Sequence, residues 1–241
     1  MSARTATLLL RLVGPMQAWG TQSQFTHRDT GLEPSFSGVI GILCAALGRP
    51  RTGAIDDLTR LTMGVRVDRE GKMRSDFHTV GGRHLQSESP YGVANVDGSV
   101  SKNPVVSYRH YLADAEFLVG LEGDRALLED VRAALRAPRW QLFLGRKSFV
   151  PSAPIYLPDA APWDGGLREE PLEATLRTYP WLGHLPPRRE PETKTLRLIL
   201  PDERGADLRT DVPLSFAERR FATRMVRPDN VTLAELEGVP A

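Results

Sequence analysis

The apolar and turn-forming positions near the N-terminus predict a strand–helix–strand unit. Residues 6–13 form an apolar run that Gly14-Pro15 ends, as expected of a strand. Residues 36–47 repeat apolar side chains at helical spacing, with Ser35 at the N-cap position and Gly48 as the stop. Two further elements, a short helix and a strand, complete the unit over 55–61 and 63–67.

A second unit of the same kind follows further along the chain. Residues 115–121 predict a strand, Asp124 is placed to cap a helix over 125–136, and 140–144 predict another strand. Two successive strand–helix–strand units make up the ferredoxin-like βαββαβ pattern of α+β proteins. This pattern folds as an antiparallel sheet with helices on one face. In RNA-recognition folds, the open face of such a sheet commonly binds single-stranded RNA.

A long insertion, at about residues 70–112, separates the two units. Its middle is rich in Gly, Ser, Asn and Pro, and Asp97-Gly98 between Val96 and Val100 is a hairpin-turn signal. A loop of this length inside a folded domain is either functional or disordered. Of the two, the pattern favours a projecting β-hairpin.

The rest of the chain predicts a smaller, β-rich C-terminal region over 151–241, after a ferredoxin-like region over 1–150. Its strands are expected over 195–200 and 221–226. Seven prolines between 158 and 191 indicate irregular structure there. The last dozen residues are expected to be frayed.

Composition places the protein in the cytoplasm. Its 241 residues are 41% apolar, and Cys44 is the single cysteine, which excludes an intramolecular disulfide and a multi-cysteine metal cluster. The short apolar run near the N-terminus does not match a signal peptide. No stretch approaches the roughly 20 apolar residues of a membrane helix, so a soluble protein with no membrane partner is expected.

The formal net charge of +1 is low for a protein that binds nucleic acid through many phosphates. RNA contacts would therefore have to come from local patches. Two stretches, 1–28 and 131–149, contain no acidic residue, and their cations are Arg4, Arg11, Arg28, Arg132, Arg136, Arg139, Arg146 and Lys147. The alternative is that these side chains, Arg132 and Arg136 above all, lie on solvated helix faces.

Two loops carry residue types that suit contacts with nucleic acid. In Gly14-Pro-Met-Gln-Ala-Trp-Gly20, Trp19 offers a surface on which a base could stack, or it is an ordinary core tryptophan. Leu144-Gly-Arg-Lys-Ser148 places two cations beside a glycine, which suits either a phosphate contact or a charged surface turn. It lacks the glycine spacing of a Walker A loop.

The five histidines do not predict a metal site. None of them is paired at His-x3-His or His-Glu-x2-His spacing, and neither a metal nor a cofactor is expected. Asp76 and His78, with Tyr108 and Tyr111, could form an acid–base set for RNA cleavage. The alternative is that His78 makes a local hydrogen bond.

Several motifs, which follow one another from about residue 10 to 225, carry a resemblance to a known family. They are Leu10-Arg-Leu-Val-Gly-Pro-Met-Gln-Ala-Trp-Gly20, Glu33-Pro-Ser-Phe-Ser-Gly-Val-Ile-Gly41, Ala45-Ala-Leu-Gly48, Asp76-Phe-His-Thr-Val80, Tyr108-Arg-His-Tyr-Leu-Ala-Asp-Ala115, Leu144-Gly-Arg-Lys-Ser148 and Phe221-Ala-Thr-Arg224. The chain resembles the CasD family, the Cas-five proteins of the RAMP superfamily that act in type I-E CRISPR Cascade complexes.

The resemblance implies a non-catalytic subunit for antiviral DNA surveillance. Members bind the crRNA 5′ handle, cap the Cascade backbone filament, and lie beside a large PAM-reading subunit and the target DNA. A β-hairpin thumb, matching residues 70–112, contacts the adjoining backbone subunit. Type I-C relatives cut RNA with a Tyr, Lys and His set, so the alternative is a metal-independent CRISPR-repeat endoribonuclease that uses His78, Tyr111 and Lys147.

The resemblance also implies which residues contact the handle, grouped by their place in the chain. The first loop contributes Gln17, Trp19 and Gly20. Arg28, Ser35 and Ser37 lie near the start of the 36–47 helix, where amides and the helix dipole attract phosphate. The remaining contacts are Arg109 at the base of the thumb and the glycine loop Gly145, Arg146, Lys147 and Ser148.

Overall fold

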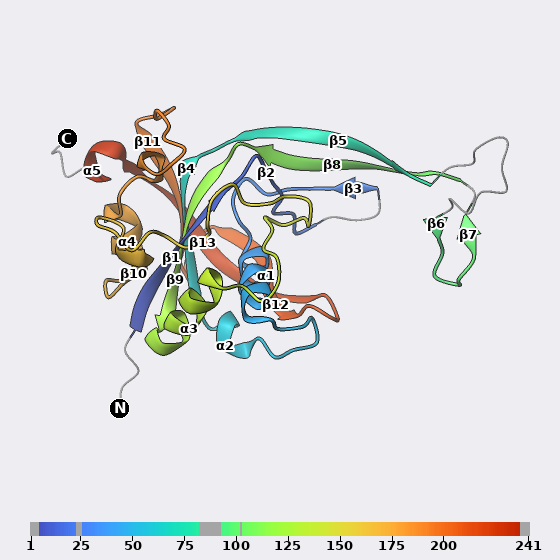
Figure 1. The fold of residues 1–241 in the computed structure, drawn as a ribbon, viewed down its shortest axis with the longest axis horizontal. Coiled ribbons are helices and arrows are strands. Elements are labelled where there is room, and N and C mark those ends of the chain that lie inside the picture. The colour runs from blue at the N-terminus through green and yellow to red at the C-terminus, as the bar shows by residue number, and fades with distance from the viewer. Residues whose placement is uncertain (1–4, 23–25, 82–92, 102, 237–241) are drawn as a thin grey trace.

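The computed structural model describes residues 5–22, 26–81, 93–101 and 103–236. Within them, a seven-stranded sheet of order β10-β1-β9-β4-β11-β13-β12 runs through the molecule, with neighbouring strands antiparallel (Figure 1). The strands are β1 Thr5–Val13, β4 Thr62–Arg69, β9 Glu116–Asp124, β10 Leu167–Arg168, β11 Thr195–Pro201, β12 Asp207–Ser215 and β13 Arg220–Thr232. The protein is therefore a mixed α/β structure built on antiparallel sheets, and its main sheet takes strands from both sides of residue 150.

Strand β1 is apolar at successive positions because both faces of the sheet are covered. Leu8, Leu10 and Leu12 belong to one buried cluster, whereas Leu9 belongs to a second cluster. A strand buried on both faces reads as a continuous apolar run, without the alternation of a half-exposed strand. Arg11, which interrupts the run, is also buried and is paired with Glu116 at 2.6 Å.

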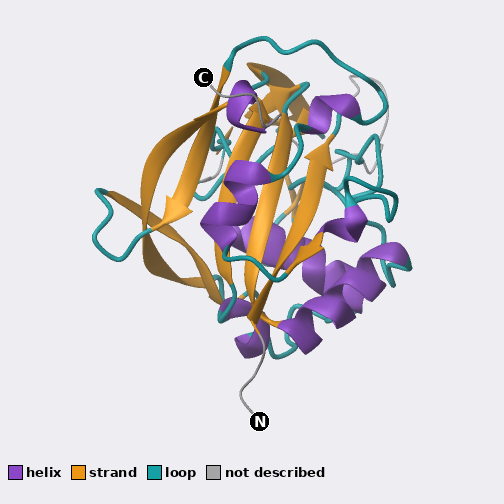
Figure 2. Ribbon diagram, turned by 90° about the vertical axis from the view of Figure 1, so that its left-hand side faces the viewer, coloured by secondary structure: helices purple, strands orange, loops and turns teal. Residues whose placement is uncertain are grey.

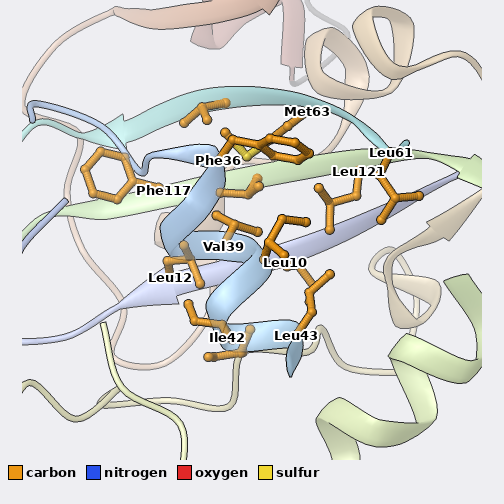
Figure 3. Close-up of a cluster of buried hydrophobic side chains, with 14 of the residues drawn as sticks. Leu10, Leu12, Phe36, Val39, Ile42, Leu43, Leu61, Met63, Phe117 and Leu121 are labelled. Atoms are coloured by element: carbon orange, nitrogen blue, oxygen red, sulfur yellow. The ribbon is translucent and has the colours of Figure 1, made fainter. Parts of the chain in front are cut away.

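Helices α1 (Phe36–Leu47) and α3 (Arg125–Arg136) pack against each other beside β1. The Ser35 hydroxyl accepts a hydrogen bond from the Gly38 amide at 3.3 Å, and Gly48 ends α1 with a φ of +73°. The Asp124 carboxylate likewise accepts the Leu127 amide at 3.0 Å at the start of α3. Apolar side chains of α1 meet those of β1 and β9 in the first cluster (Figure 3).

Helix α4 (Leu172–Thr178) covers the opposite face of the sheet, nearest the viewer in Figure 2. It packs on Gly64 of β4 and Gly120 of β9, which lie opposite each other in the sheet. A Cβ atom on Gly64 would lie 2.7 Å from Leu176, and one on Gly120 would lie 2.5 Å from Leu172. The absence of side chains at these two positions therefore brings α4 close to the strands.

A buried arginine joins this covering segment to the sheet. The Arg66 guanidinium is fully buried, pairs with Asp68 at 2.6 Å and donates to the carbonyls of Leu176, Tyr179 and Pro180. The Asp68 carboxylate in turn accepts the Leu182 amide at 2.9 Å. Burying a charge costs little free energy only when the charge is paired and fully hydrogen-bonded. The network therefore holds residues 176–182 against the sheet, where their backbone groups can bond to Arg66 and Asp68.

The insertion is a projecting hairpin, as the sequence predicted (Figure 1). Strands β5 (Lys72–Val80) and β8 (Val105–Ala113) pair antiparallel through nine residues each. The short strand β2 (Met16–Gln17) pairs with β8 at its base, and the short strand β3 (His27–Arg28) pairs with the middle of β8. Beyond the hairpin, β6 (Val93–Ala94) and β7 (Val100–Ser101) flank the turn at Asp97-Gly98, and 82–92 and 102 lie outside the described residues. We call β5 and β8 the thumb.

Most predicted elements of the first region are confirmed, but two expectations are wrong. Residues 140–144 form no strand, since the Arg139 and Trp140 amides instead donate to the carbonyls of Ala46 and Ala45 at the end of α1. The two-residue strand β10 pairs with β1 in their place. The sheet also has no open face beside β1, because the α4 segment covers the face that was expected to bind RNA.

The second region is more ordered than its composition indicated. The predicted strands over 195–200 and 221–226 are confirmed as β11 and β13, but β12 was missed. The proline-rich 158–191 stretch contributes buried side chains to the second cluster, including Trp163 and Trp181. Part of the expected frayed end forms a helix with buried Leu233 and Leu236, and residues 237–241 lie outside the described part. The short helices are α2 Asp56–Thr59, η1 Asp164–Gly166, η2 Leu182–His184 and α5 Leu233–Leu236.

None of the described helices is long and apolar enough to cross a bilayer.

Removing the carboxylate of Asp68 tests the buried arginine network. Asp68→Ala leaves the Arg66 charge unpaired inside the protein, so the free energy of unfolding in urea should fall by about 3–5 kcal/mol. The control Asp130→Ala, on the exposed side of α3, should change it by less than about 0.5 kcal/mol. Equal effects of the two variants would contradict the role given to Arg66.

Candidate nucleic-acid interface

Segments that are far apart in the sequence meet at the base of the thumb. Strands β2 and β3 lie on β8, and the Ala18 amide donates to the Leu144 carbonyl at 3.1 Å. Gly145 touches the same loop with a φ of +87°, and a Cβ atom there would lie 1.7 Å from the Ala18 carbonyl oxygen. Only glycine fits this position, so the loop over 144–149 is held directly against the 14–20 loop.

Three arginines gather where these segments meet. Arg28 of β3 and Arg109 of β8 lie opposite each other in the strand register, so their side chains share one face. The Arg146 guanidinium donates to the His110 carbonyl at 2.7 Å and to the Arg28 carbonyl at 3.3 Å, which ties β3 to β8. The pKa of Arg146 is lowered by burial and by the neighbouring charges of Arg109 and Arg28. We call Arg28, Arg109, Arg146 and Lys147 the basic cluster.

The loop that carries Arg146 also presents backbone donors. The amides of Leu144, Gly145 and Phe149 are used within the loop. Those of Arg146, Lys147 and Ser148 make no hydrogen bond with the described part of the chain. Lys147 is exposed and has no ion pair there either. Successive free amides beside cations are a common arrangement for binding phosphate.

The thumb has two chemically different faces because strand side chains alternate. One face carries Arg109 and Arg28, with Asp76 opposite Arg109. The other face carries an aromatic row, defined as His27, Tyr108 and Phe77, one from each of three adjacent strands. The Tyr108 ring lies 5.7 Å from that of His27 and 5.3 Å from that of Phe77. Phe77 is 59% exposed and Tyr108 46%.

Along the described strands, the face with the aromatic row carries no Asp, Glu, Lys or Arg, and it carries the two histidines His27 and His110. Its remaining positions on β5 and β8 are Met73, Ser75, Thr79, Val106, His110 and Leu112. Sequence reasoning did not single out His27 or Phe77. The signal that could have found Phe77 is the alternation in Lys72–Val80, where charged and polar side chains occupy every second position up to His78.

Gln17 and Trp19, expected to contact RNA, are core residues. Trp19 is 2% exposed and its ring packs against Gly38 of α1, where a Cβ atom would lie 2.9 Å from the indole. The Gln17 amide is fully buried, donates to the carbonyls of Leu12 and Ala115, and accepts the Trp19 indole N–H at 3.2 Å. In this conformation no base can reach the Trp19 ring, so the core alternative is the correct one. Gly20, by contrast, is exposed.

The N-terminus of α1, where Ser35 and Ser37 were expected to attract phosphate, is filled from within the chain. The Ser35 hydroxyl serves as the helix cap, and the Phe36 amide donates to the Asp211 carboxylate at 2.7 Å. Asp211 is also paired with Arg224 at 2.7 Å. A groove of about 660 Å³ adjoins this site, and its lining includes the buried carboxylates of Asp211 and Glu33 together with the arginines that pair with them, Arg224 and Arg209. The helix start is therefore poorly suited to a phosphate.

Three of the other candidate arginines, Arg11, Arg132 and Arg136, pair with carboxylates. Arg11 is buried against Glu116. Arg132 and Arg136 of α3 both pair with Asp159, at 2.7 and 2.5 Å, and they lower the pKa of Asp159 to about 2. Arg4 lies outside the described residues. These cations contrast with Lys147, whose charge is unpaired within the described chain.

The candidate cleavage residues are not brought together. His78 lies opposite Ser107 and Tyr111 lies opposite Arg74, so about four residues, roughly 13 Å, separate them along the thumb. His78 Nε2 lies 3.1 Å from the Asp76 carboxylate, the local hydrogen bond of the alternative interpretation. The Tyr111 ring packs on Phe149 with centroids 5.8 Å apart. The described residues contain no group of three potential metal ligands.

Comparison with known proteins identifies relatives of this chain. The family model described as CRISPR-associated protein (Cas_Cas5) matches residues 7–227. The chain is 33% identical over 164 residues to the CRISPR system Cascade subunit CasD of Escherichia coli strain K12, which covers 62% of this chain and 69% of that protein.

Two solved structures share the fold over nearly the whole chain. One, described as a crystal structure of a Cas protein, is 45% identical with a TM-score of 0.72 and covers 97% of each chain. The other is a chain of a CRISPR RNA-guided surveillance complex, 36% identical with a TM-score of 0.74, covering 94% of this chain and 90% of that one. On the strength of the family match and these relatives, the chain belongs to the Cas5 family of CRISPR-associated proteins.

Proposed function

We propose that the protein is the crRNA-binding subunit of a type I-E CRISPR Cascade complex, in which it holds the 5′ handle and caps the backbone filament. Membership of the Cas5 family, and the similarity to a Cascade subunit and to a chain of an RNA-guided surveillance complex, support the assignment to such a complex. The contact with the handle is supported by the basic cluster.

The observation that carries this proposal is the place of the basic cluster. Both faces of the main sheet beside β1 are closed, so the usual RNA-binding surface of this kind of sheet is covered. In contrast, Arg28 of β3 and Arg109 of the thumb lie beside the Arg146 side chain of the glycine loop, in which the amides of Arg146, Lys147 and Ser148 have no partner among the described residues. Cations and backbone donors together suit the phosphates of a single strand.

The two faces of the thumb divide its contacts between partners. The face with Arg28 and Arg109 receives the RNA backbone. The face with the aromatic row carries no Lys or Arg along β5 and β8, which makes it a poor surface for phosphates and a good one for protein. We assign this face to the adjoining backbone subunit, with the large PAM-reading subunit and target DNA elsewhere nearby.

The finer description of the fold belongs to the same proposal. Strands β10, β1, β9 and β4, with α1 and α3, have the strand order of a ferredoxin-like module, in which β10 is the fourth strand. The thumb is inserted between its second and third strands. The remaining strands, β11, β13 and β12, are the β-rich contribution of residues 151–241 to the sheet.

Removing three cations of the basic cluster should weaken RNA binding in a salt-dependent way. Arg28→Ala, Arg109→Ala and Lys147→Ala combined remove three phosphate contacts, each of which contributes about 0.7 to the log–log salt slope of single-strand binding, so the slope should fall by about 2. Binding of crRNA, by the reconstituted complex if needed, is measured across a salt series.

A matched control removes arginines of the same kind that are already paired. Arg132→Ala with Arg136→Ala leaves the basic cluster intact and should leave the slope unchanged, because both of these α3 side chains are engaged by Asp159. Arg146 is kept in both variants, since its guanidinium links β3 to β8. An unchanged slope in the triple variant would place the RNA elsewhere on the molecule.

Removing two rings of the aromatic row should affect subunit assembly and not RNA binding. Phe77→Ala with Tyr108→Ala should leave RNA affinity and its salt slope nearly unchanged while reducing co-purification with the backbone subunit. Thr79→Ala, on the same face, is the control and should assemble normally. A loss of RNA affinity at constant slope would show instead that the rings stack on bases.

We also propose that the protein is not an RNA-cleaving enzyme. The candidate residues His78 and Tyr111 are far apart along the thumb, and the His78 ring is hydrogen-bonded to the Asp76 carboxylate. Repeat RNA incubated with the purified protein should stay intact, with or without magnesium. Site-specific cleavage that disappears in His78→Ala would favour the endoribonuclease alternative.

A further inference from the structure

The thumb leaves the main sheet through two sharp bends that lie side by side. Gly71, between β4 and β5, has a φ of +72°, and Asp114, between β8 and β9, has a φ of +61°. A Cβ atom on Gly71 would lie 2.7 Å from the Ala115 Cβ, so the two bends touch. A positive φ is uncommon for a residue other than glycine, which makes Asp114 the notable member of the pair.

The side chain of Asp114 is held by two arginines from different parts of the chain. Arg189 donates to both carboxylate oxygens, at 2.8 and 3.1 Å, and Arg69 approaches one of them at 3.1 Å. Arg69 is itself paired with Glu192 at 2.7 Å. A two-point contact from a planar guanidinium fixes the orientation of a carboxylate as well as its position.

The segment that carries Arg189 is fixed to the body of the protein. The Arg189 amide donates to the Gly183 carbonyl at 3.0 Å, and the buried Arg11 of β1 donates to the Pro186 carbonyl at 3.0 Å. Leu182, which directly precedes Gly183, donates its amide to the Asp68 carboxylate. The contact between Arg189 and Asp114 therefore connects the base of the thumb to the ordered cover of the sheet.

We infer that Asp114, Arg189 and Arg69 form a latch that sets the direction in which the thumb projects. The three are positioning residues for the RNA and protein contacts of the thumb, and in this respect the inference rests on the proposed function. Nine residues of β-strand reach about 30 Å, so a rotation of about 10° at the base would move the far end by about 5 Å. Such a shift would misplace both faces.

The latch governs orientation more than global stability. Asp114 and Arg189 are partly exposed to solvent, and ion pairs in such surroundings contribute little to the free energy of unfolding. The same exposure makes the latch sensitive to screening by salt. Its loss should therefore appear as a wider range of thumb positions in a protein that remains folded.

Spin labels on the thumb and the body measure this range directly. Cysteines introduced by Thr79→Cys on β5 and Asp130→Cys on α3 carry the labels, both at exposed positions. The native Cys44 is buried, and burial raises the pKa of its thiol to about 11, so it stays protonated and unlabelled near neutral pH. The wild-type background should give one narrow distance distribution in the free protein.

Three variants change the latch in graded ways. Arg189→Ala should lose the narrow distribution, and Asp114→Asn should do so while keeping the bend, because asparagine tolerates a positive φ. Arg189→Lys keeps the charge without the two-point contact and should be intermediate. The control is Arg132→Ala, which breaks the ion pair between Arg132 of α3 and Asp159, a pair whose exposure is similar to that of Arg189 and Asp114. It should keep the wild-type distance distribution.

Two results would overturn the inference. One is an unchanged distance distribution in both Arg189→Ala and Asp114→Asn at wild-type stability in urea. The other is a broadened distribution with wild-type crRNA binding and subunit assembly, which would remove the positioning role. Failure of the unmodified protein to bind crRNA would contradict the proposed function alone, since the distances are measured without RNA.

Discussion

The buried guanidinium of Arg66 is the constraint on which the architecture depends. Its charge lies inside the protein and is compensated by Asp68 and by three carbonyls from the end of α4 and the segment that follows it. Because those partners come from a proline-rich stretch with little regular structure, the arginine decides where that stretch lies. The result is a main sheet whose two faces are both covered beside β1.

With the sheet covered beside β1, accessible strand side chains are found on the thumb, where Phe77 is 59% exposed and Tyr108 46%. The side chains of β5 and β8 alternate between the two faces of the thumb, so the thumb presents two different surfaces. One of them carries arginines and the other an aromatic row. We therefore expect the functional contacts on the thumb, outside the hydrophobic core. The direction in which the thumb projects from the main sheet then decides where those contacts lie.

Several residues near the base of the thumb combine structural and electrostatic roles. Arg146 holds β3 and β8 together through backbone carbonyls while adding positive charge beside Arg28 and Arg109. Gln17 and Trp19 support the same loops from inside the core. Residues of this kind are poor subjects for a simple binding test, since their removal changes the fold of the site as well as its charge.

The sequence by itself determined the elements whose signals are local. The caps at Ser35 and Asp124, the helical spacing of α1 and the turn at Asp97-Gly98 depend on neighbours within a few residues. Tertiary structure decided the rest. Strand β10 is two residues long and exists because β1 has a free edge, and Trp19 is buried because Gly38 makes room for it. Which arginines are paired depends on carboxylates far away in the chain, and sequence spacing carries no information about those distances.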